Sequence, residues 1–145
     1  MLRALDVEET MKSKWFGIMF FLILAGCGGG GSNSTSPPPT MNGTWTFTAK
    51  STVFGLTVTG TGTILQTGNS LSGTLALVGS PCATSAALTG SANGTSLNFQ
   101  IVETGQAVGF VGNATADFSS ASGTYSAQAG GCTDGDSGTW TATKS

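Results

Sequence analysis

Large apolar and polar side chains alternate with a period of two through most of the chain after residue 43. In the run 45–49, Trp, Phe and Ala alternate with threonine, and in the run 97–101, Leu, Phe and Ile alternate with Asn and Gln. No stretch of this region shows the 3.6-residue period of an amphipathic helix. The pattern is typical of antiparallel strands that pack one face and expose the other.

Turn-forming pairs such as Gly68-Asn69 separate the alternating runs, and these residues tolerate the backbone of tight hairpins. We therefore predict an all-β fold whose strands follow one another in an up-and-down meander. The same alternation places Leu56 and Ala116 on the packed face. Eight strands can close into a barrel, which removes exposed edges, and a two-sheet sandwich is the alternative. The predicted strands are residues 43–50, 55–66, 70–78, 84–91, 95–104, 106–117, 121–128 and 137–144.

The charge content narrows the range of partners. Charged residues make up 8% of the chain, against about 25% in a typical soluble domain. After Cys27, two lysines stand against four acidic residues, which gives a net charge of −2. Such a surface cannot neutralise a row of phosphates, so we expect no nucleic-acid partner.

The N-terminal segment has the pattern of a secretory signal. Lys12 and Lys14 precede a nearly continuous apolar run over residues 15–25. A run of this length is too short for a membrane span, which needs about 17–25 apolar residues, but it suits a signal core. We therefore predict that residues 1–26 are a signal peptide. The acidic residues among positions 6–9 are unusual in front of such a core, which favours Met11 as the true start.

The signal core ends in Leu24-Ala25-Gly26-Cys27, which resembles the lipobox of bacterial lipoproteins. The resemblance implies cleavage before Cys27, a diacylglyceryl group on its thiol, and an amino terminus acylated by a fatty acid such as palmitate. Two or more acyl chains anchor a protein stably. Because Gly28 rather than Asp follows the cysteine, the resemblance also favours the outer membrane. The alternative is an ordinary signal peptide with an unrelated cysteine.

Residues 27–40 carry no apolar side chain that could join a core beyond Cys27 itself. Glycine and serine dominate the first part, and three consecutive prolines follow at 37–39. Such a segment is a flexible coil that ends in a stiffer spacer. We predict a tether over 27–40 that leads to a β domain over 41–145.

The start of the domain, Gly43-x-Trp45, resembles the Gly-x-Trp motif of lipocalins and avidin-like proteins, which are eight-stranded meander barrels. The ligand contacts of those families do not transfer to this sequence. We expect a mostly filled interior, and the alternative is a barrel that holds a small ligand. Gly123 and Gly138 each precede a large aromatic residue by two positions, and glycine within a strand often marks a bend in a barrel wall. The candidate ligand-lining residues are Trp45, Phe99, Glu103, Phe110 and Tyr125.

Cys82 and Cys132 are the two cysteines that remain after Cys27. An exported protein resides where disulfides persist, and a bridge between them would close a loop of about 50 residues, worth on the order of 4 kcal/mol. We predict this disulfide; two free thiols are the alternative.

The catalytic repertoire of the sequence is narrow. The chain contains no histidine, which excludes His-based nucleophile systems and His-ligated metals. Glu103 shares the parity of the inward residues at a barrel mouth, whereas Asp117 should face water, so the two form a poor acid–base pair. Asp134-x-Asp136 begins like a calcium loop but lacks its later ligands; we interpret it as a solvated turn. We assign no catalytic, cofactor or metal residue.

These patterns predict a non-enzymatic lipoprotein of the bacterial envelope that presents a small β-barrel to envelope polymers or proteins. The alternative function is that of a calycin-like carrier for a small apolar or sugar-like molecule. A carrier requires an internal cavity of a few hundred cubic ångströms.

Overall fold

The computed structural model describes residues 36–145. The predicted signal peptide and Cys27 lie outside the described residues. Within them, no helix is long and apolar enough to cross a membrane. The eight strands are β1 (Gly43–Ser51), β2 (Thr57–Thr67), β3 (Ser70–Val78), β4 (Ser85–Asn93), β5 (Ser96–Glu103), β6 (Gln106–Ala114), β7 (Ser120–Ala127) and β8 (Ser137–Lys144).

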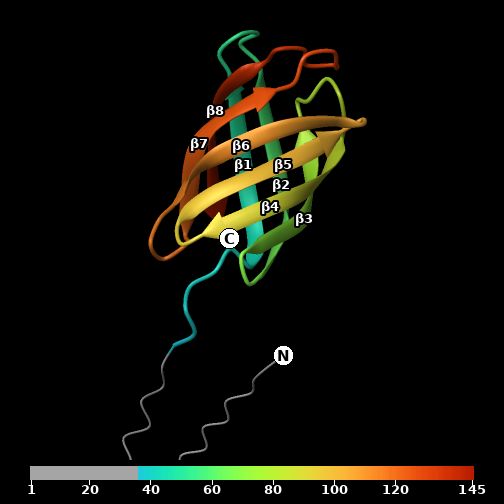
Figure 1. Cartoon of the computed structure of the whole chain (residues 1–145). Coiled ribbons are helices and arrows are strands. Elements are labelled where there is room, and N and C mark those ends of the chain that lie inside the picture. Colours follow the sequence, from blue (N-terminus) through green and yellow to red (C-terminus); the bar gives the residue numbers. More distant parts are fainter. Residues whose placement is uncertain (1–35) are drawn as a thin grey trace, which may run out of the picture. The chain divides into compact units, whose positions relative to one another are not determined.

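The strands form one closed antiparallel barrel in meander order (Figure 1). Each strand pairs with its neighbour in sequence, and β8 returns to pair with β1 along the register from Trp45↔Lys144 to Ser51↔Gly138. The predicted all-β meander and its closure into a barrel are therefore confirmed, and the sandwich alternative is excluded.

The two ends of the barrel differ in their loops. The end called the base carries the short connections 68–69, 94–95 and 115–119, together with the start of β1 and the end of β8. The opposite end, called the mouth, carries the connections 52–56, 79–84, 104–105 and 128–136. Figure 1 shows residues 36–40 approaching β1 at the base, close to the C-terminus. The mouth is thus the end away from both termini of the domain.

An aromatic cluster fills the middle of the barrel. The Phe110 ring lies at its centre, stacked on Phe99 with ring centroids 5.0 Å apart and meeting Phe47 edge-on at 5.3 Å. Trp140 stacks on Phe47 at 5.5 Å and meets Phe99 edge-on at 5.3 Å. Tyr125 stacks against Phe110 at 5.5 Å towards the mouth. Edge-on and offset-stacked pairs are the favourable aromatic geometries, and these rings occupy the middle of the barrel, as expected of a mostly filled interior.

Trp140 owes its position to two glycines, Gly123 on the neighbouring strand β7 and Gly112 on β6. A Cβ atom at Gly123 would stand 2.8 Å from the indole Nε1, and one at Gly112 would stand 2.7 Å from indole Cζ2. The indole N–H donates to the carbonyls of Val111, at 3.2 Å, and Thr124, at 3.1 Å. The absent side chains therefore leave the space in which a buried Trp satisfies its polar atom.

The base is closed by the first residues of the domain. The Trp45 indole N–H donates to the carbonyl oxygen of Met41 at 2.8 Å, and both side chains are buried. The Lys144 ammonium lies 5.9 Å from the centroid of the Trp45 ring and donates to the carbonyl of Thr40 at 2.9 Å. These contacts join β1 to the end of β8 where the chain enters the barrel.

Two residues assigned to the packed face, Leu56 and Ala116, lie outside the strands and are exposed, although Leu56 also lines the cavity at the mouth. Leu56 is 39% exposed, since β2 begins only at Thr57. Ala116 is exposed because β6 ends at Ala114 and the chain turns, with the Thr115 amide donating to Ser120 at 2.8 Å. Phe118 adopts a φ of 54° in that turn and is buried. The turn thus returns an aromatic side chain to the core without continuing the strand.

We predict that Gly123→Ala destabilises the barrel by at least about 1–3 kcal/mol, because the added methyl would collide with the Val111 carbonyl oxygen and stand 2.8 Å from the Trp140 indole. Urea unfolding followed by tryptophan fluorescence measures the change. Gly109→Ala is the matched control on β6, since a Cβ there would meet only the Ser126 carbonyl, at 3.9 Å. Equal stability of the two variants would contradict the role given to Gly123.

Candidate functional site at the barrel mouth

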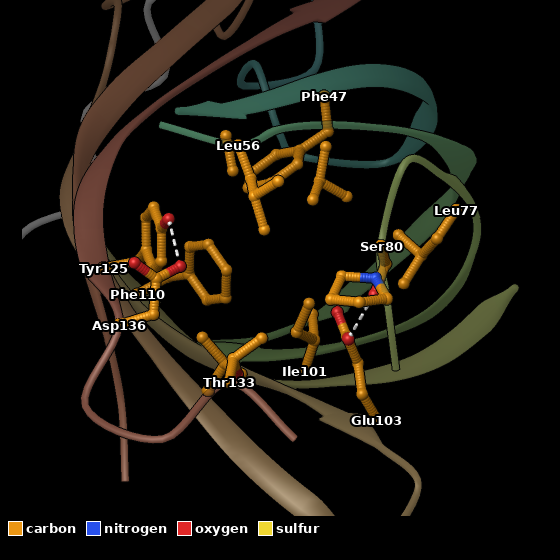
Figure 2. A pocket seen from close by; sticks show the side chains of 14 residues that line it. Phe47, Leu56, Leu77, Ser80, Ile101, Glu103, Phe110, Tyr125, Thr133 and Asp136 are labelled. Carbon is orange, nitrogen blue, oxygen red and sulfur yellow. Dashed lines mark hydrogen bonds between the residues drawn. The ribbon is translucent and has the colours of Figure 1, made fainter. Parts of the chain in front are cut away.

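A small cavity opens beneath the loops of the mouth (Figure 2). The space open to the centres of water-sized spheres is about 40 Å³. The aromatic cluster forms its floor through Phe47 and Phe110, and the loop residues Leu56, Pro81 and Thr133 line its upper part. A second cavity of about 20 Å³ lies among apolar side chains around Trp45 and Leu71.

Glu103, the last residue of β5, is one of two carboxylates in the mouth cavity. It is 7% exposed, and its Oε2 atom accepts a hydrogen bond from the Ser80 hydroxyl at 2.7 Å. Ser80 Oγ also accepts from the backbone amides of Cys82, at 3.1 Å, and Ala83, at 3.4 Å. Ser80 therefore orders its own loop and orients the carboxylate across the gap between β3 and β5.

Asp136 is the second carboxylate, and its oxygens are fully engaged. It is 5% exposed. Its Oδ1 accepts from the Ser51 hydroxyl at 2.6 Å and from the Ser137 amide at 2.8 Å, and its Oδ2 accepts from the Tyr125 hydroxyl at 2.9 Å. Ser51 Oγ in turn accepts from the amide of Phe54 at 2.8 Å. The two carboxylates are thus each oriented by a serine that also holds a mouth loop.

The environment of Tyr125 keeps its phenol protonated. Burial, followed by the hydrogen bond and the negative charge of Asp136, raises the pKa of Tyr125 to about 12. The folded barrel therefore favours the neutral phenol. Its hydroxyl donates to Asp136, whereas a phenolate has no proton to donate and would repel the carboxylate.

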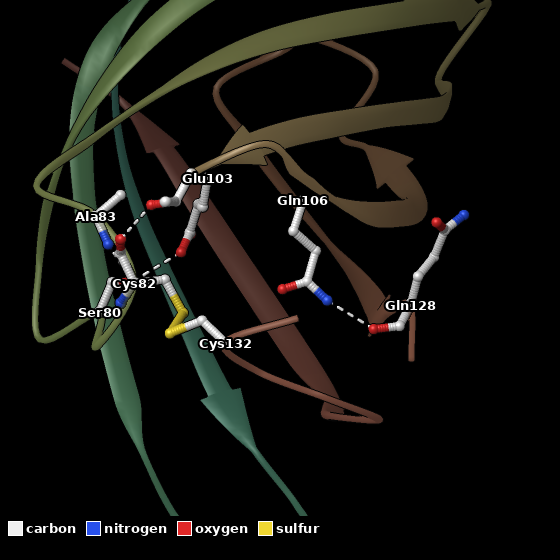
Figure 3. Close-up of a disulfide and its surroundings, with 8 residues drawn as sticks. Ser80, Cys82, Ala83, Glu103, Gln106, Gln128 and Cys132 are labelled. Carbon is white, nitrogen blue, oxygen red and sulfur yellow. Dashed lines mark hydrogen bonds between the residues drawn. A yellow bond between two sulfur atoms is a disulfide. The ribbon is translucent and has the colours of Figure 1, made fainter. Parts of the chain in front are cut away.

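A disulfide joins two of the mouth loops (Figure 3). Cys82 in the loop 79–84 and Cys132 in the loop 128–136 are bridged with their Cα atoms 5.7 Å apart. The Thr104 hydroxyl donates to the carbonyl of Cys82, and the Gln106 amide donates to the carbonyl of Gln128 at 2.6 Å. The predicted Cys82–Cys132 bridge is confirmed, and it fixes the rim beside Glu103.

The structure divides the candidate ligand-lining residues between the two cavities. Glu103, Phe110 and Tyr125 line the mouth cavity, whereas Trp45 and Phe99 line the apolar space toward the base. The aromatic members pack against other core side chains and do not surround one common cavity.

Sequence reasoning missed Asp136. Asp134 is exposed as expected of a solvated turn, and its Oδ1 accepts from the Gly130 amide at 2.7 Å, but Asp136 is buried and faces Tyr125. The parity of Trp140 and Ala142, both inward, extends back along even positions to 136 and could have identified it. In residues 36–145, no three His, Cys, Asp or Glu side chains gather as metal ligands.

Asp117 lies at the other end of the barrel from Glu103. It is exposed in the base connection 115–119, where hydrogen bonds from Thr115 and Ser119 lower the pKa of its carboxyl to about 2. The two acidic residues that sequence analysis weighed as a pair are therefore not brought together.

Neither a protein-family model nor a curated protein matches this sequence.

We predict that the single tyrosine of the chain titrates with a midpoint near pH 12 in the folded protein, against about 10 when unfolded. Absorbance of the phenolate measures it. Because the folded-state pKa is raised, the neutral phenol stabilises the barrel below pH 10, and this contribution is lost as the pH rises through about 12.

The same titration has two informative variants. Asp136→Asn should lower the Tyr125 midpoint by removing the adjacent charge, while Asp134→Asn, in the exposed part of the same loop, should leave it unchanged. A folded protein that titrates near pH 10 would overturn the assignment of the hydrogen bond.

We further predict that replacing both Cys82 and Cys132 by serine lowers the free energy of unfolding by about 4 kcal/mol, because the bridge closes a loop of about 50 residues in the unfolded chain. Comparison of urea midpoints measures this loss. The far-ultraviolet circular dichroism should remain that of the barrel, since every strand keeps both hydrogen-bonded neighbours. A variant as stable as the wild type would contradict a constraining role for the bridge.

Proposed function

We propose that this chain is a lipid-anchored lipoprotein of the bacterial envelope that displays a rigid, non-enzymatic β-barrel for structural or interaction roles. The sequence supports the anchor through the apolar run 15–25 and the lipobox-like residues that end in Cys27. The single observation that carries the display role is the packed interior, in which Phe110 contacts aromatic rings on several strands.

The chain path supports this arrangement. Residues 36–40 reach the barrel at the base, so a tether through 27–40 would hold the domain by its closed end. The mouth, with its disulfide and longer loops, would then be the part most available to envelope polymers or proteins. We place the protein at the outer membrane on the strength of Gly28 after the cysteine.

The carrier alternative receives less support. Pockets for whole small molecules measure about 300–1,000 Å³, whereas the mouth cavity has about 40 Å³ and the inner one about 20 Å³. A whole apolar or sugar-like ligand would have to displace the stacked rings of Phe99 and Phe110, which close that space.

The anchor is tested by expressing the full chain in a Gram-negative bacterium with labelled palmitate. We predict a labelled, membrane-associated product whose mass matches cleavage before Cys27, and loss of the label in Cys27→Ser. The matched control carries serine at both Cys82 and Cys132 and should keep the label. An unlabelled wild-type product recovered free of membranes would refute the proposal.

A further inference from the structure

The two buried carboxylates of the mouth cavity differ in the number of hydrogen bonds that they accept. Asp136 receives three hydrogen-bond donors on its two oxygens. Glu103 receives one, from Ser80 on Oε2, and no described residue donates to Oε1. Every fully buried polar side-chain atom in residues 36–145 has a partner, so the unbonded Oε1 is not fully buried. Glu103 lines the mouth cavity and also an open surface hollow beside Gln106 and Cys132. Glu103 is therefore an open acceptor that is more than nine-tenths buried.

No cation of the described chain neutralises this site. The two lysines of residues 36–145 are Lys144, which lies at the base, and Lys50, which is exposed on the outer face of β1. Neither lines the cavity. Figure 2 shows Glu103 and Asp136 on opposite sides of the cavity. A group that enters between them would meet two carboxylates and no basic side chain, and charges that are buried in proteins are paired.

The remaining walls select the kind of cation. Phe47, Phe110 and Tyr125 contribute aromatic rings, and rings attract organic cations. A calcium ion takes 6–8 oxygen ligands, but the Asp136 oxygens already accept three hydrogen bonds, and Phe47 and Phe110 offer no oxygen. The cavity of about 40 Å³ offers roughly three water-sized positions. That volume suits an ammonium head with one or two methylene groups and excludes a larger ring.

The rim can accommodate the rest of such a ligand. Leu56 and Pro81 line the outer part of the cavity, and the adjacent loop 52–56 exposes Val53 and Phe54 by 55% and 54%. We infer that the mouth binds the primary ammonium group of an aliphatic amine, with the head donating to Glu103 Oε1 and the alkyl stem lying against Leu56 and Pro81. This inference goes beyond the display role and does not depend on the lipid anchor.

The test titrates the full chain at pH 7 with n-butylammonium chloride and follows the backbone amide resonances of Ser80, Glu103 and Tyr125. Aliphatic amines with a pKa near 10.4 are charged at this pH. We expect saturable shifts at these residues in the millimolar range. The neutral isostere n-butanol should bind at least about tenfold more weakly, because it lacks the charge-assisted hydrogen bond.

Variants separate the carboxylate from general charge effects. Glu103→Gln, which preserves shape, should weaken butylammonium binding at least about tenfold. Asp117→Asn removes the same charge at the base and should leave binding unchanged. The dispersion of the amide spectrum reports whether each variant is folded. Equal binding of butanol, unchanged binding by a folded Glu103→Gln, or saturable binding of calcium chloride in place of butylammonium would overturn the inference.

One further arm identifies the natural source of the amine. Nα-acetyl-lysine amide carries the same ammonium group on a peptide side chain. Binding at least as tight as that of butylammonium supports a lysine of a partner protein as the occupant. Binding of butylammonium without the lysine derivative supports a free aliphatic amine. Failure of both ligands to shift the mouth residues refutes the site.

Discussion

Pairing between the first and last strands is the constraint on which the rest of the structure depends. The β1–β8 ladder runs from Trp45↔Lys144 to Ser51↔Gly138 and closes the barrel. Closure removes every sheet edge and fixes the circumference of the wall, so the inward side chains must fill a set volume. The same ladder places Trp140 beside Phe47, from which the stacked cluster extends through Phe110. Packing in the middle of the barrel thus follows from the pairing of β1 with β8.

The base and the mouth of the barrel are closed by different kinds of interaction. The base buries the apolar side chains of Met41 and Trp45, and the Lys144 ammonium lies 5.9 Å from the centroid of the Trp45 ring. The mouth uses hydrogen bonds, in which Ser51 and Ser80 each hold a loop amide and a carboxylate. A buried carboxylate without a partner would oppose folding, so this end is stable only because its donors are in place. Asp136 meets that requirement entirely within the chain, whereas Glu103 keeps one open oxygen.

The alternation of side chains was enough to predict eight strands and the inward parity of Glu103, because a strand has a strict two-residue period. It failed where the backbone leaves the sheet, as at Leu56 and Ala116, because a pattern cannot reveal where hydrogen bonds stop. The disulfide was predicted from the number of cysteines and from the predicted export of the protein. The hydrogen bonds of Asp136 could not be predicted in the same way. Its partners Ser51 and Tyr125 lie on β1 and β7, and only the closed register brings them together. Glycine spacing suggested bends, but it did not show that Gly123 stands opposite Trp140, because the spacing does not give the register of β7 on β8.

The even number of strands places the beginning and the end of the described chain at the same end of the barrel. In a meander, each strand reverses the chain, so an even number returns the chain to the end where it began. Residues 36–40 and Ser145 therefore both belong to the base (Figure 1). The four connections of the mouth lie at the end away from residues 36–40 and Ser145. The longest of them carries Cys132 and Asp136, which link it to the loop of Cys82 and to β1. Side chains on these loops are consequently held in a fixed geometry at the end opposite to residues 36–40.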